Sequence, residues 1–279
     1  MQGMQPKMPN QPSTTSNQKT SEQKNTQNKS ILFEYPLQES VRGYLRLESL
    51  FRQFHRNLAA TNPDNHVHAL KILFEILEIL ARGDTRAELI KELTRLLHFF
   101  QKLTENPEVD TSKLSNFLQQ IEQLHQWVHN YQGKFGESIR KHPFIAAVKH
   151  RSSIPGGSCS FDCPDLYLFL NRSFEVRKKE LSEWVSDIKG IQTSIDVILR
   201  LIRDSGQWRP EEAPLGSFML ETSEQSIKLM RIRAVDSEET FPEFSCGKHR
   251  SSIHFMTFNQ QHKKIPLNAA VKFELACCN

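Results

Sequence analysis

The sequence is poor in cysteine and in long hydrophobic runs. It has five cysteines in 279 residues, an odd count that we interpret as reduced thiols in a cytosolic protein rather than a disulfide framework. No apolar run approaches the ~20 residues needed to span a bilayer, so we expect no membrane partner. The first apolar stretch begins only at Ile31, so we also expect no signal peptide and a cytoplasmic location.

The motifs of catalysis and nucleotide binding are also missing. Neither G-x-S-x-G, nor the Walker pattern, nor G-x-G-x-x-G occurs in the chain. Ser158, Cys159 and Ser160 follow a Gly-Gly turn, and His142 and His150 are near in sequence, but no orienting carboxylate is evident. We therefore predict that the protein is not an enzyme and takes no small-molecule substrate or cofactor. A thiol enzyme is the alternative.

Two pairs of residues have the spacing of metal ligands. Cys159 precedes Cys163 by four positions, and Cys246 precedes His249 by three. No C-x2-C pair accompanies them. We predict that the chain binds no metal, and a structural zinc site at Cys159 and Cys163 is the alternative.

Positive charge is in excess, but it is concentrated at the N-terminus. The formal net charge is +4, and residues 1–30 contribute +3 of it through four lysines and one glutamate. The remainder is close to neutral, so a general affinity for nucleic acid is not implied. Residues 1–30 are rich in Gln, Asn, Ser and Thr with almost no apolar content, which predicts a disordered tail.

The order of hydrophobic patterns predicts an α+β fold. Residues 31–36 read as a strand, and amphipathic helical spacing then continues to about residue 204, with a weaker helix over 137–151 that Pro143 kinks or restarts. Strands are predicted at 218–221, 227–235, 253–258 and 270–277. We expect a helical domain at 37–207 and a small antiparallel β-domain at 208–279 that also takes in the early N-terminal strand.

A crowded turn interrupts the helical region near the middle of the chain. Pro155 lacks an amide proton, and Gly156 and Gly157 favour backbone angles that are closed to other residues. Asp162 or Cys163 can cap the helix that follows. The pattern predicts a tight turn between two helices.

Local basic clusters are the best candidates for an interaction surface. On the first helix Arg42, Arg46 and Arg56 fall within roughly 100° of one another. Further basic residues flank the central turn or lie in the strand region: Arg140, Lys149, Arg151, Arg231, Lys248 and Arg250. The simpler interpretation is a solvated helix face. The functional one is a basic groove, where helices meet sheet, that accepts the carboxylates of a peptide or polymer.

Three stretches together resemble the ZapD family of bacterial cell-division proteins. They are LFEYPL at residues 32–37, SIPGGSCSFD at 153–162 and FELACC at 273–278. The resemblance runs in one order from about Ile31 to Asn279. It implies a helical domain joined to a β-domain, and a dimer that is not an enzyme.

The same resemblance implies a function and a site. Such proteins bind the C-terminal tail of FtsZ and bundle its protofilaments, which promotes assembly of the Z-ring at midcell. Binding uses basic residues in a groove between the two domains. Arg46 lies in the matching Leu-Arg-Leu-Glu motif, Arg140 and Arg151 align around the central motif, and Lys248 and Arg250 match a basic segment of the β-domain. A basic helical adaptor for nucleic acid or another acidic partner is the alternative.

Overall fold

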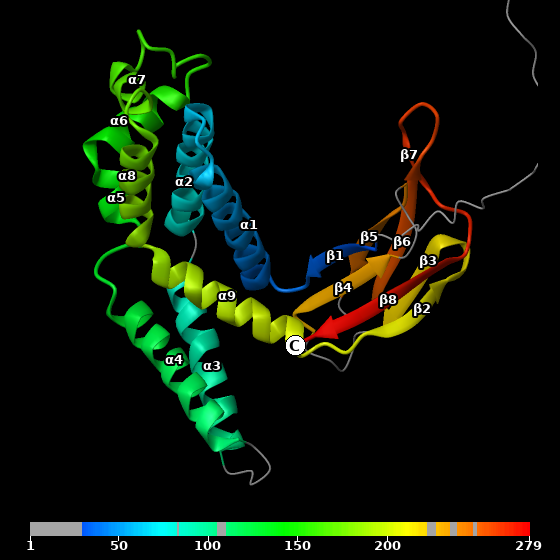
Figure 1. Cartoon of the computed structure of the whole chain (residues 1–279). Coiled ribbons are helices and arrows are strands. Elements are labelled where there is room, and N and C mark those ends of the chain that lie inside the picture. Colours follow the sequence, from blue (N-terminus) through cyan, green and yellow to red (C-terminus); the bar gives the residue numbers. More distant parts are fainter. Residues whose placement is uncertain (1–29, 83, 105–109, 222–226, 235–238, 248–249) are drawn as a thin grey trace, which may run out of the picture.

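Helices precede strands along the chain, which confirms the predicted α+β class (Figure 1). The computed structural model describes residues 30–82, 84–104, 110–221, 227–234, 239–247 and 250–279. The predicted tail therefore lies, apart from Ser30, outside the described residues. The helices are α1 Glu39–Ala59, α2 Pro63–Arg82, α3 Thr85–Leu103, α4 Thr111–Asn130, α5 Glu137–Lys141, α6 Pro143–Ser152, α7 Pro164–Leu170, α8 Phe174–Ser186 and α9 Lys189–Asp204.

Helix α9 occupies the centre of the helical part. Its Ile191, Ile195, Ile198 and Ile202 recur at spacings of three and four and are at most 1% exposed. Burying each such side chain stabilises the fold by about 1.5–3 kcal/mol. The helix packs against α1, α3 and α4, and its last turn reaches the strand region (Figure 1).

The strands that the structure describes form two sheets. They are β1 Ile31–Pro36, β2 Arg209–Ala213, β3 Ser217–Glu221, β4 Leu229–Ala234, β5 Phe241–Cys246, β6 Arg250–Phe258, β7 Lys264–Pro266 and β8 Val271–Cys278, with a 3-10 turn at Pro214–Gly216. The first sheet has the order β1-β4-β8-β2 and the second β3-β6-β5, with β7 beside β6. Ile232 and Leu275 of the first sheet pack with Phe255 of the second in one buried cluster, so the sheets lie face to face.

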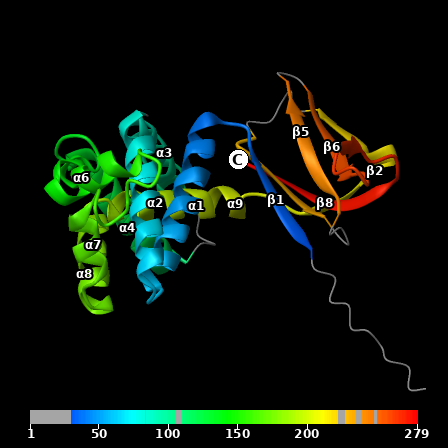
Figure 2. The same ribbon diagram turned by 90° about the horizontal axis from the view of Figure 1, so that it is seen from above.

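The early strand joins the distant strands, as predicted. β1 pairs antiparallel with β4, from Ile31 opposite Ala234 to Pro36 opposite Leu229. Helix α1 follows β1 after two residues, so the chain passes directly from sheet to helix (Figures 1 and 2). α1 lies between α2 and the strands in both views.

The predicted restart at Pro143 is confirmed, whereas three strands were missed. The weak helical region over 137–151 is two helices, and α6 begins at Pro143 because His142 is extended (φ −63°, ψ 125°), as the residue before a proline tends to be. β2, β5 and β7 were not predicted. β2 is Arg-Pro-Glu-Glu-Ala, which lacks β-branched and aromatic residues, and it forms by pairing with β8.

Helices and strands share part of one core. Leu229, Ala276 and Cys278 of the first sheet belong to the same buried cluster as the helical side chains. The division into a helical domain at 37–207 and a β-domain at 208–279 stays a prediction.

Candidate interaction surface

One side of helix α1 is buried and the opposite side carries arginines. Val41, Tyr44 and Phe51 on the buried side are at most 2% exposed. Arg42, Arg46 and Arg56 lie on the other side and are called the α1 face below. Arg46 and Arg56 are exposed and have no carboxylate within 4 Å among the residues that the structure describes. Their guanidinium groups are therefore available to an anionic partner.

Arg42 connects the α1 face to the strands. Its Nε lies 3.1 Å from Glu39 Oε2, and its Nη2 donates to the Pro36 carbonyl at 3.3 Å. The guanidinium carbon also lies 5.7 Å from the centre of the Tyr35 ring, which stacks on Phe244 of β5 at 4.4 Å. An aromatic surface thus adjoins the first arginine of the face.

Arg231 is paired within the protein, at the junction between helices and strands. It lies 3.0 Å from Glu34, its partner across the β1–β4 pair, and 5.2 Å from the Trp208 ring. Glu34 also pairs with Arg203 at the end of α9, and Arg203 reaches Glu48 of α1. Arg203 makes hydrogen bonds of 2.5–2.9 Å to both carboxylates. Glu48 and then Glu34 raise the pKa of Arg203, although burial opposes them.

A second buried ion pair supports the same junction. Lys228, just before β4, donates to Glu92 of α3 at 2.6 Å, and Arg95 donates to the same oxygen. Burial alone would raise the pKa of Glu92, but the hydrogen bonds from Arg95 and Lys228 lower it. Burial lowers the pKa of Lys228. These charges join α3 to the residue just before β4.

Three of the predicted basic residues lie on the other side of α2 from the α1 face. Arg140 of α5 donates to the Leu77 carbonyl of α2 at 3.3 Å, and Lys149 of α6 lies 3.3 Å from Glu78. Arg151 is exposed at the end of α6. Figures 1 and 2 both show α6 on the far side of α2 from α1. The structure therefore does not bring these residues together with Arg46.

The remaining predicted residues lie in the strand region and the central turn. Arg250 begins β6 and is exposed, and Lys248 lies outside the described residues. In the turn Gly156 has a positive φ of 75°, and a Cβ at Gly157 would collide with the Arg151 carbonyl. Asp162 is half-buried, and Pro155 is exposed. Only glycine suits both glycine positions.

Exposed apolar side chains, which the sequence patterns did not predict, lie near this turn. Phe161 is 82% exposed, Leu168 62% and Tyr167 57%. The sequence of α7 contains a signal for them. This seven-residue helix has apolar residues on all its sides, and only Leu166 and Phe169 of them are buried. Such clusters are typical of contact surfaces.

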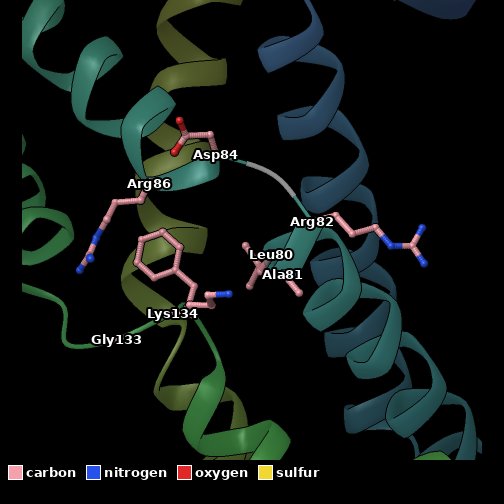
Figure 3. A pocket seen from close by; sticks show the side chains of 8 residues that line it. Leu80, Ala81, Arg82, Asp84, Arg86, Gly133 and Lys134 are labelled. Atoms are coloured by element: carbon pink, nitrogen blue, oxygen red, sulfur yellow. The ribbon is translucent and has the colours of Figure 1, made fainter.

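A basic hollow lies where α2 meets α3, but its side chains do not converge. It has a volume of about 400 Å³ and is lined by Leu80, Ala81, Arg82, Asp84, Arg86, Gly133, Lys134 and Phe135. Figure 3 shows Arg82 and Arg86 pointing in opposite directions. Arg86 donates to the Val128 carbonyl at 3.2 Å and to the Tyr131 carbonyl, and Arg82 lies 3.5 Å from Glu78. Both arginines have other partners, so they do not form a joint anion site, and Lys134 is the remaining cation of the lining.

Comparison with known proteins identifies the family. A family model described as ZapD, cell division protein, matches residues 45–254. The chain belongs to the ZapD family. A Cell division protein ZapD of Pectobacterium carotovorum subsp. carotovorum (strain PC1) is 36% identical over 248 residues, which cover 89% of this chain and 97% of that protein. The Cell division protein ZapD of Azoarcus sp. (strain BH72) is 33% identical, with 89% and 99% covered.

Membership in the ZapD family supports a role in cell division. In the part of the chain that the structure describes, no group of three or more His, Cys, Asp and Glu side chains could hold a metal ion. Cys163 is buried while Cys159 and Cys246 are exposed. No described helix is both long enough and apolar enough to cross a membrane. Within this ZapD-family chain the α1 face is the candidate site.

Proposed function

We propose that this protein binds the C-terminal tail of FtsZ through the α1 face and cross-links FtsZ protofilaments as a homodimer. This would promote assembly and stability of the Z-ring at midcell, in the cytoplasm. The observation that carries the proposal is the row of arginines on α1, of which Arg46 and Arg56 lack a carboxylate partner among the described residues, in a member of a cell-division family.

The chemistry of the α1 face suits a flexible acidic peptide. A guanidinium group can donate two parallel hydrogen bonds to one carboxylate. The aromatic pair Tyr35 and Phe244 beside Arg42 offers a surface for an apolar side chain of the same peptide. Exposed ion pairs contribute only about 0.2–1 kcal/mol each, so a single tail should bind weakly.

Bivalency explains how weak contacts would bundle filaments. A dimer offers two tail sites, and linking two sites can raise binding to a polymer by ~10²–10⁴ without any new contact. The same two sites would hold neighbouring protofilaments together. In this proposal residues 37–207 and 208–279 are two domains, and the ion pairs of Arg203 and Lys228 keep them in fixed orientation.

We expect the other predicted basic residues to contribute less to tail binding than Arg46. Arg231 and Lys149 already pair with carboxylates, so they are less available than Arg46. Arg140 donates to a carbonyl. Arg151 and Arg250 are exposed, and with Lys248 they remain candidates for contacts with other parts of the tail.

The test is co-pelleting of the purified protein with GTP-polymerised FtsZ, with and without the FtsZ C-terminal tail. The proposal predicts pelleting and bundling with intact FtsZ and neither with the tailless form. A folded dimer that pellets equally with both forms, or with neither, would contradict it. Retention on DNA at physiological salt, in place of pelleting, would favour the adaptor for nucleic acid.

A further inference from the structure

A second hollow, between α4 and α9, has a different chemistry from the α1 face. Its volume is about 340 Å³, and it is lined by Phe117, Gln120, Ile121, Gln123, Leu124, Trp127, Gly190, Thr193 and Val197. Phe117, Leu124 and Trp127 remain half-buried although they are large and apolar. We call this the α4–α9 groove.

The groove keeps its shape because Gly190 has no side chain. A Cβ there would collide with the Trp127 ring, so the indole lies directly on the backbone of α9. Trp127 is further held by Tyr131 at 5.2 Å between ring centres, and Phe117 by Phe100 at 5.0 Å. The apolar walls are therefore fixed before any ligand arrives, which lowers the cost of binding.

The rim of the groove is polar, and one cation, Arg200, lies over an aromatic side chain of its lining. Asn116, Gln120 and Gln123 border it on α4, and all three are exposed. On α9 the guanidinium of Arg200 lies over the Phe117 ring at 6.0 Å, and Lys189 lies one turn before Thr193 on the same side of the helix.

Neither of these cations is neutralised by a described carboxylate. No ion pair within 4 Å involves Arg200 or Lys189 in the described ranges, although Asp196 and Asp204 are each four residues from Arg200. Asp196 interacts instead with Glu48 and His55 of α1, and burial raises its pKa. The charge that complements the groove is therefore negative.

We infer that the α4–α9 groove binds an acidic amphipathic helix of a partner protein. Apolar side chains at i, i+4 and i+7 span roughly 10 Å along a helix, which matches the length of α9 from Gly190 to Val197. They would lie on Phe117, Leu124 and Trp127, while carboxylates at the two ends meet Arg200 and Lys189. This site is separate from the α1 face and makes the protein an adaptor with two kinds of partner.

The probe is an acetylated, dye-labelled helical peptide of about 15 residues, with leucines at i, i+4 and i+7 and glutamates at both ends. Binding to the full chain is followed by fluorescence anisotropy. We expect saturable binding with a Kd of about 10–100 µM, typical of a small interface. Arg200→Glu should weaken it about tenfold, and Thr193→Phe, which fills the groove, should abolish it.

Matched controls keep the inference falsifiable. Lys263→Glu makes the same charge change at an exposed site of the β6–β7 turn and should have no effect. A peptide with lysines in place of glutamates should bind Arg200→Glu better than the wild type. Arg46→Glu should bind the acidic peptide normally, so failure here and failure of the FtsZ proposal are distinguishable.

Four results would overturn the inference. The first is equal binding of a peptide with its leucines scattered around the helix. The second is binding that neither Arg200→Glu nor Thr193→Phe changes, and the third is no binding up to about 1 mM. The fourth is self-association of the chain that Thr193→Phe abolishes, which would assign the groove to a second copy.

Discussion

Arg203 and Arg46 are the same residue type in opposite circumstances. The Arg203 side chain is 21% exposed and makes four hydrogen bonds to Glu34 and Glu48, which belong to β1 and α1. Arg46 is exposed and has no described carboxylate partner. A desolvated, fully paired arginine is used by the fold, whereas an exposed and unpaired one is available to a ligand. Pairing and burial thus separate structural cations from binding cations.

The sharpest test of this comparison removes each charge in turn. Arg203→Met should lower the free energy of unfolding by about 2–3 kcal/mol, because it leaves the partly buried Glu48 unpaired and Glu34 with Arg231 as its remaining partner. Arg46→Met should change it by less than about 0.5 kcal/mol. Urea unfolding followed by circular dichroism measures both. Equal losses of unfolding free energy in the two variants would contradict the distinction between a structural and a binding arginine.

Salt should separate the two sets of charges next. The Debye length falls from ~10 Å at 0.1 M to ~3 Å at 1 M ionic strength, so exposed arginines lose their attraction for a peptide while buried pairs are screened less. We expect FtsZ tail binding to weaken about tenfold over this range. Fluorescence anisotropy with a labelled tail peptide measures it. Affinity that does not depend on salt would exclude the exposed arginines as the main contacts.

Arg177 is a third kind of arginine, because it is buried and has no carboxylate within 4 Å in the described ranges. It is 4% exposed and donates to the carbonyls of Thr61 at 2.8 Å and Leu170 at 3.0 Å. Its Nε donates to His66 Nδ1 at 3.0 Å, so His66 must be neutral and accept this hydrogen bond. Burial, and to a lesser degree the charge of Arg177, lower the pKa of His66.

This pair predicts a loss of stability in acid. Below about pH 6.5 His66 becomes protonated in the unfolded chain but stays neutral in the folded chain. The unfolded state then binds more protons, so the free energy of unfolding decreases as the pH is lowered. The loss is at most about 1.4 kcal/mol per pH unit for one proton. Urea unfolding from pH 7.5 to 5.5 measures it. His66→Gln should flatten the curve, and an unchanged slope would argue against a neutral His66.

The smallest expected effect concerns the far end of the α1 face. Arg56 is ten residues from Arg46, or roughly 15 Å along the helix, which exceeds the Debye length at physiological salt. Arg56→Glu should therefore weaken tail binding only about two- to threefold. The same anisotropy assay measures it. A loss as large as that from Arg46→Glu would mean that the tail spans the whole face.

Much of the fold was predictable because local patterns agree with it. The three- and four-residue spacing of Val41, Tyr44 and Phe51 predicts α1, and the isolated apolar run at Ile31 predicts a strand that pairs far away. β2 was not predictable, since Arg-Pro-Glu-Glu-Ala has no intrinsic strand preference and depends on β8.

The candidate site was only partly predictable for a similar reason. In the sequence, Arg46 and Arg231 are both basic residues next to apolar ones, and this pattern does not show which of them is free to bind a partner. Only tertiary pairing distinguishes them, because Glu34 lies opposite Arg231 across the β1–β4 pair, while no described carboxylate lies within 4 Å of Arg46. The α4–α9 groove likewise depends on the approach of Trp127 to Gly190, which are far apart in sequence.

The most direct test of the proposed site is the affinity of an FtsZ C-terminal tail peptide for Arg46→Glu beside wild type, with Lys263→Glu as the matched control. The account predicts at least a tenfold loss for Arg46→Glu, no change for the control, and the same urea midpoint for all three proteins. Unchanged affinity in a well-folded Arg46→Glu would contradict the account and remove the α1 face from tail binding.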